Sequence, residues 1–340
     1  MSQELTVPCA GELFAELLPA RGPVRAVSRF AEGSVTGAYR IGFAQADALP
    51  VVLKIYGTDS LWEAAKEARA LRFLTGHGIN ISPRVLAFSS AADALGGRPC
   101  VVSSLRPGRT LTEVGDALTQ AQLHEVYRQV GEVLKRLHAI PADGYGYVNG
   151  EIHKPLPDNR SHMDRMFERE LRAFRENAAD PAPGPDPDLA DDLTAYVAAH
   201  SAAFSACLRP AYCHGDVHEP NLLVDLAEDG TCALTGLLDP LNMHAGDPLM
   251  DFVRLDAFSM RGDPTKIDGL LSGYGISVPG RPSGPWPVPW RSRLRLYRIA
   301  LALELYNWFT IIGQTIHLPS LTRELRELVS GVEVQSQTDR

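Results

Sequence analysis

The sequence has few of the features that mark secreted, membrane-spanning or nucleic-acid-binding proteins. Its 340 residues include five cysteines, an odd number, and none are spaced as CxxC. This argues against a disulfide framework or a zinc site and favours a reducing cytoplasm. The formal net charge is −8 and the pI is about 5.7. An acidic chain of this kind weighs against nucleic acid and anionic membranes as partners.

Long apolar runs are also missing. The longest, residues 299–312, is interrupted by Glu304 and Asn307 and is too short to span a bilayer. Residues 1–7 lack the basic-then-apolar order of a signal peptide. We therefore expect a cytoplasmic protein that does not enter a membrane.

Apolar residues make up 45% of the chain, which is enough for a large core. The first hundred residues show short runs typical of strands, at 24–27, 38–43, 51–56, 85–88 and 99–102, and the run 51–56 is rich in β-branched residues. A helix is expected at 60–76, with Ser60 and Glu63 as a capping box. Helical periodicity dominates afterwards, at 121–140, 163–177, 189–208, 248–260, 291–313 and 318–329. The length predicts two lobes: a β-rich N-terminal lobe (1–106) and a helical C-terminal lobe (107–340), an α+β fold.

The most informative segment is HGDVHEPN at residues 214–221, which leads into an apolar run. It places Asp216 five residues before Asn221, and Asp239 follows eighteen residues later. In phosphoryl transfer, one carboxylate orients the attacking hydroxyl and accepts its proton, while an amide and a second carboxylate hold Mg²⁺ on the nucleotide phosphates. The pattern therefore predicts a kinase. The alternative is a turn rich in Asp and Asn that only caps a hairpin.

Lys54 interrupts an otherwise apolar strand, and lysine is rarely buried unless it is paired. Glu67 lies thirteen residues later, on the inward face of the following helix. A Lys–Glu pair that links strand to helix is what kinases use to grip the α- and β-phosphates. Two alternatives stay open: Glu63 as the partner, or Lys54 on the exposed face of an edge strand.

Residues 33–37, GSVTG, join the first two predicted strands. Glycines let a backbone approach phosphate, and Ser34 and Thr36 offer hydroxyls and amides. The segment matches neither GxGxxG nor GxxxxGK[ST], and any hairpin could carry it. Its place upstream of Lys54 makes Gly33, Ser34 and Thr36 candidate phosphate contacts.

The order of Gly-rich loop, strand lysine, helix glutamate, hinge, HGDxxxxN and metal aspartate resembles the aminoglycoside phosphotransferase family of the protein-kinase-like fold. Relatives of that family include choline, homoserine and fructosamine kinases. The resemblance covers roughly residues 24–328. Its most specific matches are HGD…N, Asp239 and GDPLMD at 246–251, with EARAL at 67–71 and RPGRTL at 106–111 as helix and hinge patterns.

The resemblance implies roles for individual residues. Asp216 would be the catalytic base, and Asn221 and Asp239 would coordinate Mg²⁺. Lys54 would bind the phosphates of ATP or GTP, with Glu67 holding it.

The resemblance also implies structural roles. His214 would pack the loop, and Asp247 and Asp251 would brace it through hydrogen bonds to its backbone. For these two acids, the alternative is a helix cap and a first-turn acid on the following helix.

Protein kinases have His-Arg-Asp and Asp-Phe-Gly where this chain has His-Gly-Asp and Asp-Pro-Leu, which argues for a small-molecule acceptor. The high Ala, Arg, Gly and Pro content suggests a GC-rich genome, where antibiotic-modifying kinases are frequent. We therefore expect transfer to an antibiotic hydroxyl, for resistance or self-protection. A metabolite kinase or an inactive binding protein on this fold are the alternatives. Several acids either meet an amino-sugar or lie on solvated helix faces: Glu151, Asp158, Asp164, Glu168 and Glu304.

Overall fold

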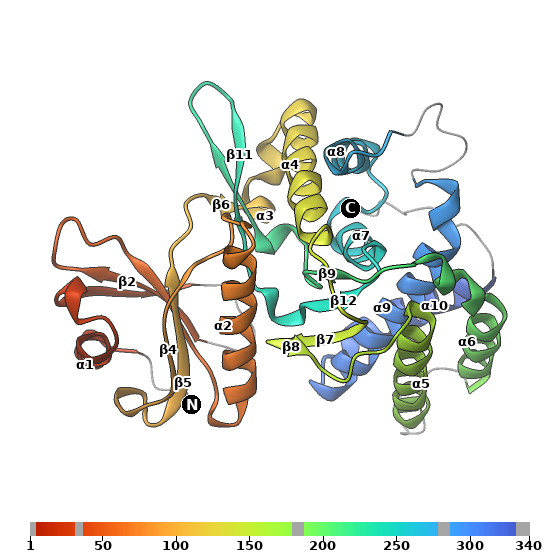
Figure 1. The fold of residues 1–340 in the computed structure, drawn as a ribbon, viewed down its shortest axis with the longest axis horizontal. Coiled ribbons are helices and arrows are strands. Elements are labelled where there is room, and N and C mark those ends of the chain that lie inside the picture. The colour runs from red at the N-terminus through yellow and green to blue at the C-terminus, as the bar shows by residue number, and fades with distance from the viewer. Residues whose placement is uncertain (1–4, 31–36, 179–186, 278–285, 331–340) are drawn as a thin grey trace. The chain divides into compact units, whose positions relative to one another are not determined.

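The structure, a computed structural model, describes residues 5–30, 37–178, 187–277 and 286–330 (Figure 1). Its contacts divide the chain into two compact units. The first comprises Met1–Leu118, Val148–Glu151 and Pro220–Met243, and the second comprises Thr119–Tyr147, Ile152–Glu219 and His244–Arg340. The first is rich in strands and the second is mostly helical, so the predicted α+β fold is confirmed.

Antiparallel strands form the main sheet of the first unit, in the spatial order β1-β2-β3-β5-β4. They are Val24–Arg29 (β1), Gly37–Phe43 (β2), Val51–Ile55 (β3), Val85–Ala92 (β4) and Arg98–Ser104 (β5). A smaller sheet, ordered β11-β10-β6, consists of Leu222–Leu226 (β10), Cys232–Leu237 (β11) and Arg109–Thr110 (β6), which precedes the short helix Leu111–Val114 (α3). Because β3 lies between β2 and β5, it is a central strand.

Two helices pack on opposite faces of the main sheet. Leu53 and Ile55 of β3 share one apolar core with α1 (Val7–Leu17). Tyr56, which follows β3, shares a second core with α2 (Leu61–Gly76). Since successive side chains of a strand point to opposite faces, Lys54 lies on the α2 face with Tyr56. The apolar residues of β3 thus direct a charged side chain towards α2.

Helix α2 begins without the expected capping box. A 3-10 turn, Thr58–Ser60, leads into it, and the Ser60 amide donates to the Gly57 carbonyl at 3.0 Å. A capping box needs that amide for the Glu63 carboxylate. Ser60 makes no side-chain cap hydrogen bond. The helix is present as predicted, but the capping-box prediction is wrong.

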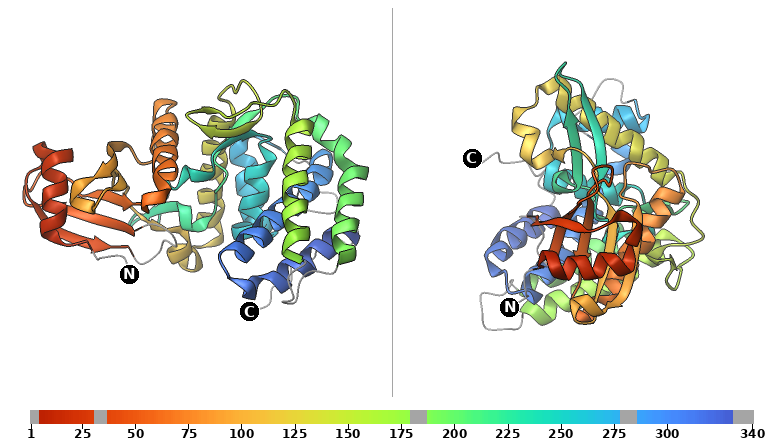
Figure 2. Two further views of the ribbon diagram at one scale, coloured as in Figure 1. Left: turned by 90° about the horizontal axis from the view of Figure 1, so that it is seen from below. Right: turned by 90° about the vertical axis from the view of Figure 1, so that its left-hand side faces the viewer.

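The second unit is organised around α9 (Arg291–Ile311), which has buried residues along most of its length and packs against α5, α7 and α10. The other helices are Gln120–His138 (α4), Asn159–Ala178 (α5), Pro187–His200 (α6), Leu249–Leu255 (α7), Pro264–Tyr274 (α8) and Leu318–Ser330 (α10). Short strands lie beside them: Gly146–Asn149 (β7), Glu151–Ile152 (β8), Ala211–Cys213 (β9) and His244–Gly246 (β12). β12 pairs antiparallel with β9. The left view of Figure 2 shows the two green helices α5 and α6 side by side.

Helices α4 and α8 approach each other at glycines, and Figure 1 shows them adjacent. A β-carbon added to Gly131 of α4 would lie 2.2 Å from the Leu270 carbonyl oxygen. One added to Gly273 of α8 would lie 1.8 Å from the Arg128 carbonyl oxygen. No side chain fits at such distances, so this backbone approach requires glycine. The result is a tightly packed helix pair.

The sequence analysis missed α1 and α8. Thr6 caps α1 by accepting from the Cys9 amide. Asp263 caps α8 by accepting from the amides of two residues in its first turn. Glycines within α8 lower its helix propensity, and that composition concealed it. No helix within the described ranges combines the length and the apolar character needed to cross a membrane.

Candidate active site

Lys54 and Glu67 form an ion pair inside the first unit. The Nζ atom of Lys54 lies 2.8 Å from Oε1 of Glu67, whose side chain is 5% exposed. Lys54 comes from the central strand β3 and Glu67 from α2. The predicted pair is therefore present and uses Glu67 rather than Glu63. The alternative of an exposed edge strand is wrong.

Tyr56 is a third member of this cluster, and the sequence analysis missed it. Its hydroxyl donates to Oε2 of Glu67, so each oxygen of that carboxylate has a partner. Burial raises the pKa of Tyr56, and the Glu67 charge adds to the effect, so the phenol stays protonated. Lys54 and Tyr56 are two residues apart in an extended segment and share a face. That spacing was the signal that could have identified Tyr56.

The cluster keeps the lysine charged. Burial by itself lowers the pKa of Lys54, but the carboxylates of Glu67 and Asp239 outweigh burial and raise the pKa above its usual value. Burial raises the pKa of Glu67, and the charge of Lys54 opposes that shift. A fixed ammonium group of this kind suits an anionic ligand such as a phosphate.

Asn221 and Asp239 flank one end of the β10–β11 hairpin in the same unit. The hairpin pairs Leu222 with Leu237, and the Asn221 carbonyl accepts from the Leu238 amide at 2.8 Å. Asp239 follows with φ of +57°, a left-handed conformation that aspartate tolerates better than most residues. Its Oδ1 lies 3.5 Å from the Lys54 ammonium, and its side chain is 41% exposed. An amide and an accessible carboxylate are oxygen ligands of the kind that fits Mg²⁺.

The candidate phosphate contacts Gly33, Ser34 and Thr36 lie outside the described residues.

Asp216 lies in the second unit, on the loop after β9, and Asp251 of α7 holds this loop. The amides of His214 and Gly215 donate to the two carboxylate oxygens of Asp251, at 2.9 and 2.8 Å. Gly215 has φ of +77°, a left-handed conformation that favours glycine. The predicted bracing role of Asp251 is confirmed.

His138 of α4 and Tyr274 of α8 complete the Asp251 network. Nε2 of His138 lies 3.0 Å from Oδ2 of Asp251, and Nδ1 lies 2.9 Å from the Tyr274 hydroxyl. Burial alone raises the pKa of Asp251, but the hydrogen bond and charge of His138 bring it down to about 2. Cys213 adds a third potential metal ligand nearby. Both His138 nitrogens are already hydrogen-bonded, so we interpret the group as a hydrogen-bond network.

Asp247 differs from its predicted role. Its Oδ2 binds Arg293 at 2.5 Å and the Tyr297 hydroxyl at 2.8 Å, both from α9. Its Oδ1 accepts from the Leu249 amide at 3.0 Å. These contacts join the start of α7 to α9 instead of holding the loop backbone. The bracing prediction is therefore wrong for Asp247, which lies just before α7 and accepts from the amide of the first residue of that helix.

A second anchor holds the far end of the loop. Oε1 of Glu219 accepts from the Tyr127 hydroxyl of α4 and from Nζ of Lys266 of α8, both at 2.8 Å. The Glu219 amide donates to the Ser259 hydroxyl at 2.9 Å. Residues 214–219 are thus fixed at both ends, with Asp216 between the anchors.

Two basic side chains contact the carboxylate of Asp216. Nη1 of Arg254 lies 3.2 Å from Oδ1, and Nε2 of His218 lies 3.7 Å from the same oxygen. Burial alone raises the pKa of Asp216, but His218 and Arg254 hold it below its usual value, so the group is ionised at neutral pH. The sequence analysis missed Arg254. Its signal was a position three residues after Asp251, on the same helix face.

Among the acids considered for binding an amino-sugar, Glu304 is connected to Asp216 through Arg254, whose Nη2 lies 3.4 Å from Oε2 of Glu304. Asp158 instead accepts a hydrogen bond from the Ser161 amide near the start of α5. Glu151 belongs to the first unit and is exposed.

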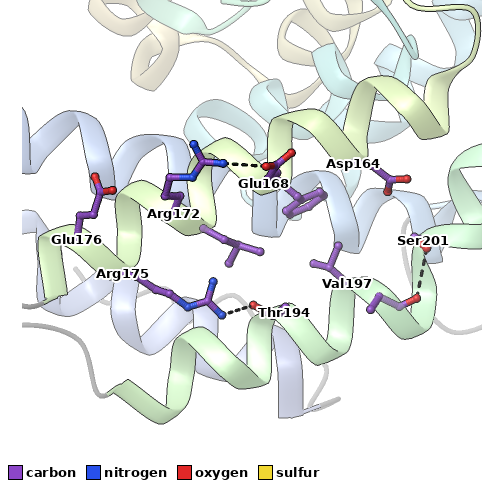
Figure 3. Close-up of a pocket in the computed structure, with 11 residues that line it drawn as sticks. Asp164, Glu168, Arg172, Arg175, Glu176, Thr194, Val197 and Ser201 are labelled. Atoms are coloured by element: carbon purple, nitrogen blue, oxygen red, sulfur yellow. Dashed lines mark hydrogen bonds and ion pairs between the residues drawn. The ribbon is translucent and has the colours of Figure 1, made fainter.

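A hollow of about 510 Å³ lies between α5 and α6 (Figure 3). Asp164 and Glu168 contribute to its lining, and Glu168 is paired with Arg172 at 2.7 Å. Arg175 crosses from α5 to the hydroxyl of Thr194 on α6 at 2.8 Å. None of the predicted catalytic, phosphate-binding or metal-binding residues that the structure describes lines this hollow. We therefore do not assign it to the reaction.

A sequence profile of the phosphotransferase enzyme family (APH) matches residues 27–286. The chain belongs to this family. The match confirms the family inferred from the motifs, and it identifies the chain as a small-molecule kinase of the phosphotransferase type.

Solved structures of low sequence identity share the fold. A thermostable mutant of aminoglycoside phosphotransferase APH(4)-Ia, in complex with AMP-PNP and hygromycin B, has a TM-score of 0.68 at 15% identity and covers 96% of this chain and 99% of its own. A protein described as a fructosamine-3-kinase from Thermobifida fusca has a TM-score of 0.65 at 18% identity, covering 95% and 100%. The GDP complex of an aminoglycoside 2′-phosphotransferase IIIa has a TM-score of 0.67 at 18% identity, covering 96% and 98%. At these identities the likeness shows the fold alone.

We expect Asp251→Asn to destabilise the protein in a pH-dependent way. The folded carboxyl has a pKa of about 2, below the ~3.9 of an unfolded aspartate. Its ionised form therefore contributes stability above about pH 4, and the contribution is lost as the pH falls towards about 2. The loss in unfolding free energy should be about 2 kcal/mol above about pH 5 and should shrink below about pH 4. Urea unfolding at a series of pH values measures it.

Asp225→Asn is the matched control, because Asp225 is an exposed acid on β10. It should change stability little at any pH. Equal stability losses for the two variants, or a loss for Asp251→Asn that does not shrink in acid, would contradict the expectation.

Proposed function

We propose that this protein transfers the γ-phosphate of ATP or GTP to a hydroxyl group of a small molecule, with Mg²⁺ as cofactor. The observation that carries the proposal is the ion pair between the half-buried Lys54 and the buried Glu67, with Asp239 3.5 Å from the same ammonium group. A lysine held in this way presents a fixed positive charge to nucleotide phosphates, and the adjacent carboxylate supplies oxygen ligands for Mg²⁺. Membership of the family is independent support.

In the proposed reaction, Asp216 accepts a hydrogen bond from the acceptor hydroxyl and takes its proton as the oxygen bonds to the γ-phosphorus. The bond from that phosphorus to the bridging β–γ oxygen breaks, and the nucleoside diphosphate leaves. Asn221 and Asp239 would hold Mg²⁺, which when bound neutralises phosphate charge. Lys54 would grip the phosphates, with Glu67 and Tyr56 fixing its ammonium. Gly33, Ser34 and Thr36 remain proposed phosphate contacts.

We assign nucleotide binding to an N-terminal lobe, residues 1–106, and catalysis and acceptor binding to a C-terminal lobe, residues 107–340. Lys54 and Glu67 belong to the former. Asn221 and Asp239 belong to the latter by sequence, although their contacts group them with the first compact unit. Asn221 follows Asp216 by five positions, so one short segment would carry both the proposed base and a proposed metal ligand.

The acceptor we propose is a hydroxyl of a sugar-containing antibiotic, for resistance or producer self-protection. The similar aminoglycoside phosphotransferases support this, one of them in complex with hygromycin B. Both donors stay open, since similar structures carry AMP-PNP and GDP. The second candidate is a metabolite kinase, which the fructosamine-3-kinase-like structure supports. The five cysteines are free thiols, which fits a cytoplasmic location.

Asp216→Asn preserves size and removes only the carboxylate. We expect turnover to fall by at least ~10²-fold, within the range for loss of a general base. Nucleotide affinity and melting temperature should be nearly unchanged. Steady-state kinetics and calorimetry measure these quantities. A variant that retains most of its turnover would show that Asp216 is not the base.

Asp239→Ala should abolish activity and remove the Mg²⁺ dependence of nucleotide affinity, because a carboxylate ligand of the metal is lost. Nucleotide titrations with Mg²⁺ and with EDTA measure the effect. Asp225→Ala is the control, since Asp225 is an exposed acid on β10 of the same hairpin. If Mg²⁺ strengthens nucleotide binding equally in wild type and in Asp239→Ala, the metal assignment is wrong.

The acceptor is tested by expression in a sensitive bacterium against an antibiotic panel, with mass spectrometry of the drug. We expect protection and one added phosphate on the drug, because a new dianion repels an anionic target and is costly to desolvate. Asp216→Asn should abolish both. Absence of protection, together with rapid turnover of choline, homoserine or a fructosamine, would establish the metabolite kinase instead.

A further inference from the structure

We propose that Arg254 is a positioning residue for phosphoryl transfer: its guanidinium fixes the orientation of the Asp216 carboxylate, and Glu304 in turn fixes the guanidinium. The inference rests on the proposed role of Asp216 as the base. It adds two residues that lie outside the recognised motifs, one on α7 and one on α9.

The geometry around Arg254 restricts its guanidinium. Nη1 lies 3.2 Å from Oδ1 of Asp216, and Nη2 lies 3.5 and 3.4 Å from the two carboxylate oxygens of Glu304. The Arg254 side chain is only 14% exposed, whereas Glu304 is 47% exposed. A guanidinium carries its donors in a rigid plane. When its two terminal nitrogens bind different carboxylates, that plane has little freedom to turn.

Phe258 supports the same arrangement. Cζ of Arg254 lies 5.8 Å from the centre of the Phe258 ring, and the centre of the His218 ring also lies 5.8 Å from it. Phe258 is therefore next to both basic side chains that approach Oδ1 of Asp216. A cation beside an aromatic ring gains additional attraction. Asp216, Glu304 and Phe258 together define the position of Arg254.

Helix α7 connects this role to the loop. Asp251 and Arg254 are three residues apart on α7, so they lie on one face of the helix. Asp251 fixes the backbone of His214 and Gly215, while Arg254 contacts the side chain of Asp216. One turn of one helix thus sets both the path of the loop and the direction of its carboxylate.

The competing interpretation is an ion pair that serves stability alone. An ion pair that acts on stability alone would leave the reaction rate and the pH profile of the folded protein unchanged. The largest charge effects on the pKa of Asp216 come from Arg254 of α7 and from His214 and His218 of the loop. Replacing Arg254 removes one of these and leaves both histidines, so its effect on Asp216 is separable.

The first measurement is the ionisation of Asp216, followed by carbon-13 NMR of aspartate-labelled full-length protein. Comparison with Asp216→Asn assigns the signal. In Arg254→Met we expect the pKa of Asp216 to rise by about one unit or more, because an opposite charge is removed. Arg254→Lys should give a smaller rise. Arg298→Gln is the matched control, since Arg298 lies on α9 of the same unit and pairs with Glu324.

The second measurement is phosphate release from Mg-ATP with water as the acceptor. In Arg254→Met we expect kcat to fall about tenfold through misorientation of the base, with KM for ATP within about twofold of wild type. The acidic limb of the kcat–pH profile should move to higher pH, because an Asp216 of higher pKa is ionised only there. Arg254→Lys should restore part of the rate. Glu304→Gln should lower kcat less than Arg254→Met does.

The outcomes separate this inference from the proposed function. An unchanged pKa of Asp216 in folded Arg254→Met overturns the inference, and so does a shifted pKa with an unchanged kcat. Undiminished phosphate release by Asp216→Asn overturns the proposed base instead. If Arg254→Met does not fold, Arg254→Lys and Glu304→Gln provide the same test, and wild-type kcat and pH profiles in both of them overturn the inference.

Discussion

The buried carboxylate of Asp251 is the interaction on which the loop around Asp216 depends. Two consecutive amides and the ring of His138 all end on its two oxygens. A buried charge is strongly destabilising unless such partners compensate it. The loop after β9 therefore adopts the one path that presents both amides to Asp251, and Gly215 takes a left-handed conformation to complete it. The backbone position of Asp216 follows from satisfying this single charge.

The close contact of α4 and α8 serves the same loop. α4 supplies His138 to the Asp251 network and Tyr127 to Glu219, and α8 supplies Tyr274 and Lys266 to the same two points. Each of the two helices must reach both Asp251 and Glu219 with a side chain, and this is possible only if the helices keep a fixed spacing. Glycines at the contact set that spacing through backbone atoms, which vary less than side-chain packing would. The close glycine contact between α4 and α8 thus helps to determine the geometry of the loop that carries Asp216.

The sequence could predict what depends on periodicity and on local spacing. The position of Lys54 in an apolar strand predicted a pair with Glu67, although Glu63 and an exposed edge strand stayed open as alternatives. The HGDxxxxN motif singled out Asp216 and Asn221 as candidate site residues. Contacts between segments that are distant in the sequence could not be predicted from it. Asp247 and Asp251 look alike in sequence, yet Arg293 and Tyr297 of α9 engage the first, and the loop amides engage the second. Helix α8 was missed because the glycines that permit its packing also lower its helix propensity. In both cases tertiary packing overrode the local signal.

The proposed phosphate-binding lysine, Lys54, and the proposed base, Asp216, are both kept charged by neighbours of opposite charge. Carboxylates raise the pKa of the half-buried Lys54, and basic groups lower the pKa of the equally half-buried Asp216, so each keeps its charge at neutral pH. A carboxylate with a lowered pKa is a weak base, which is the opposite of the tuning that maximises proton abstraction near pH 7. That is acceptable where the transition state is loose and little proton transfer is needed before the phosphoryl group departs. In the proposed reaction, Asp216 would then mainly orient the hydroxyl, and the proposed roles of Asp251, Arg254 and Glu304 are to fix the orientation of Asp216 itself.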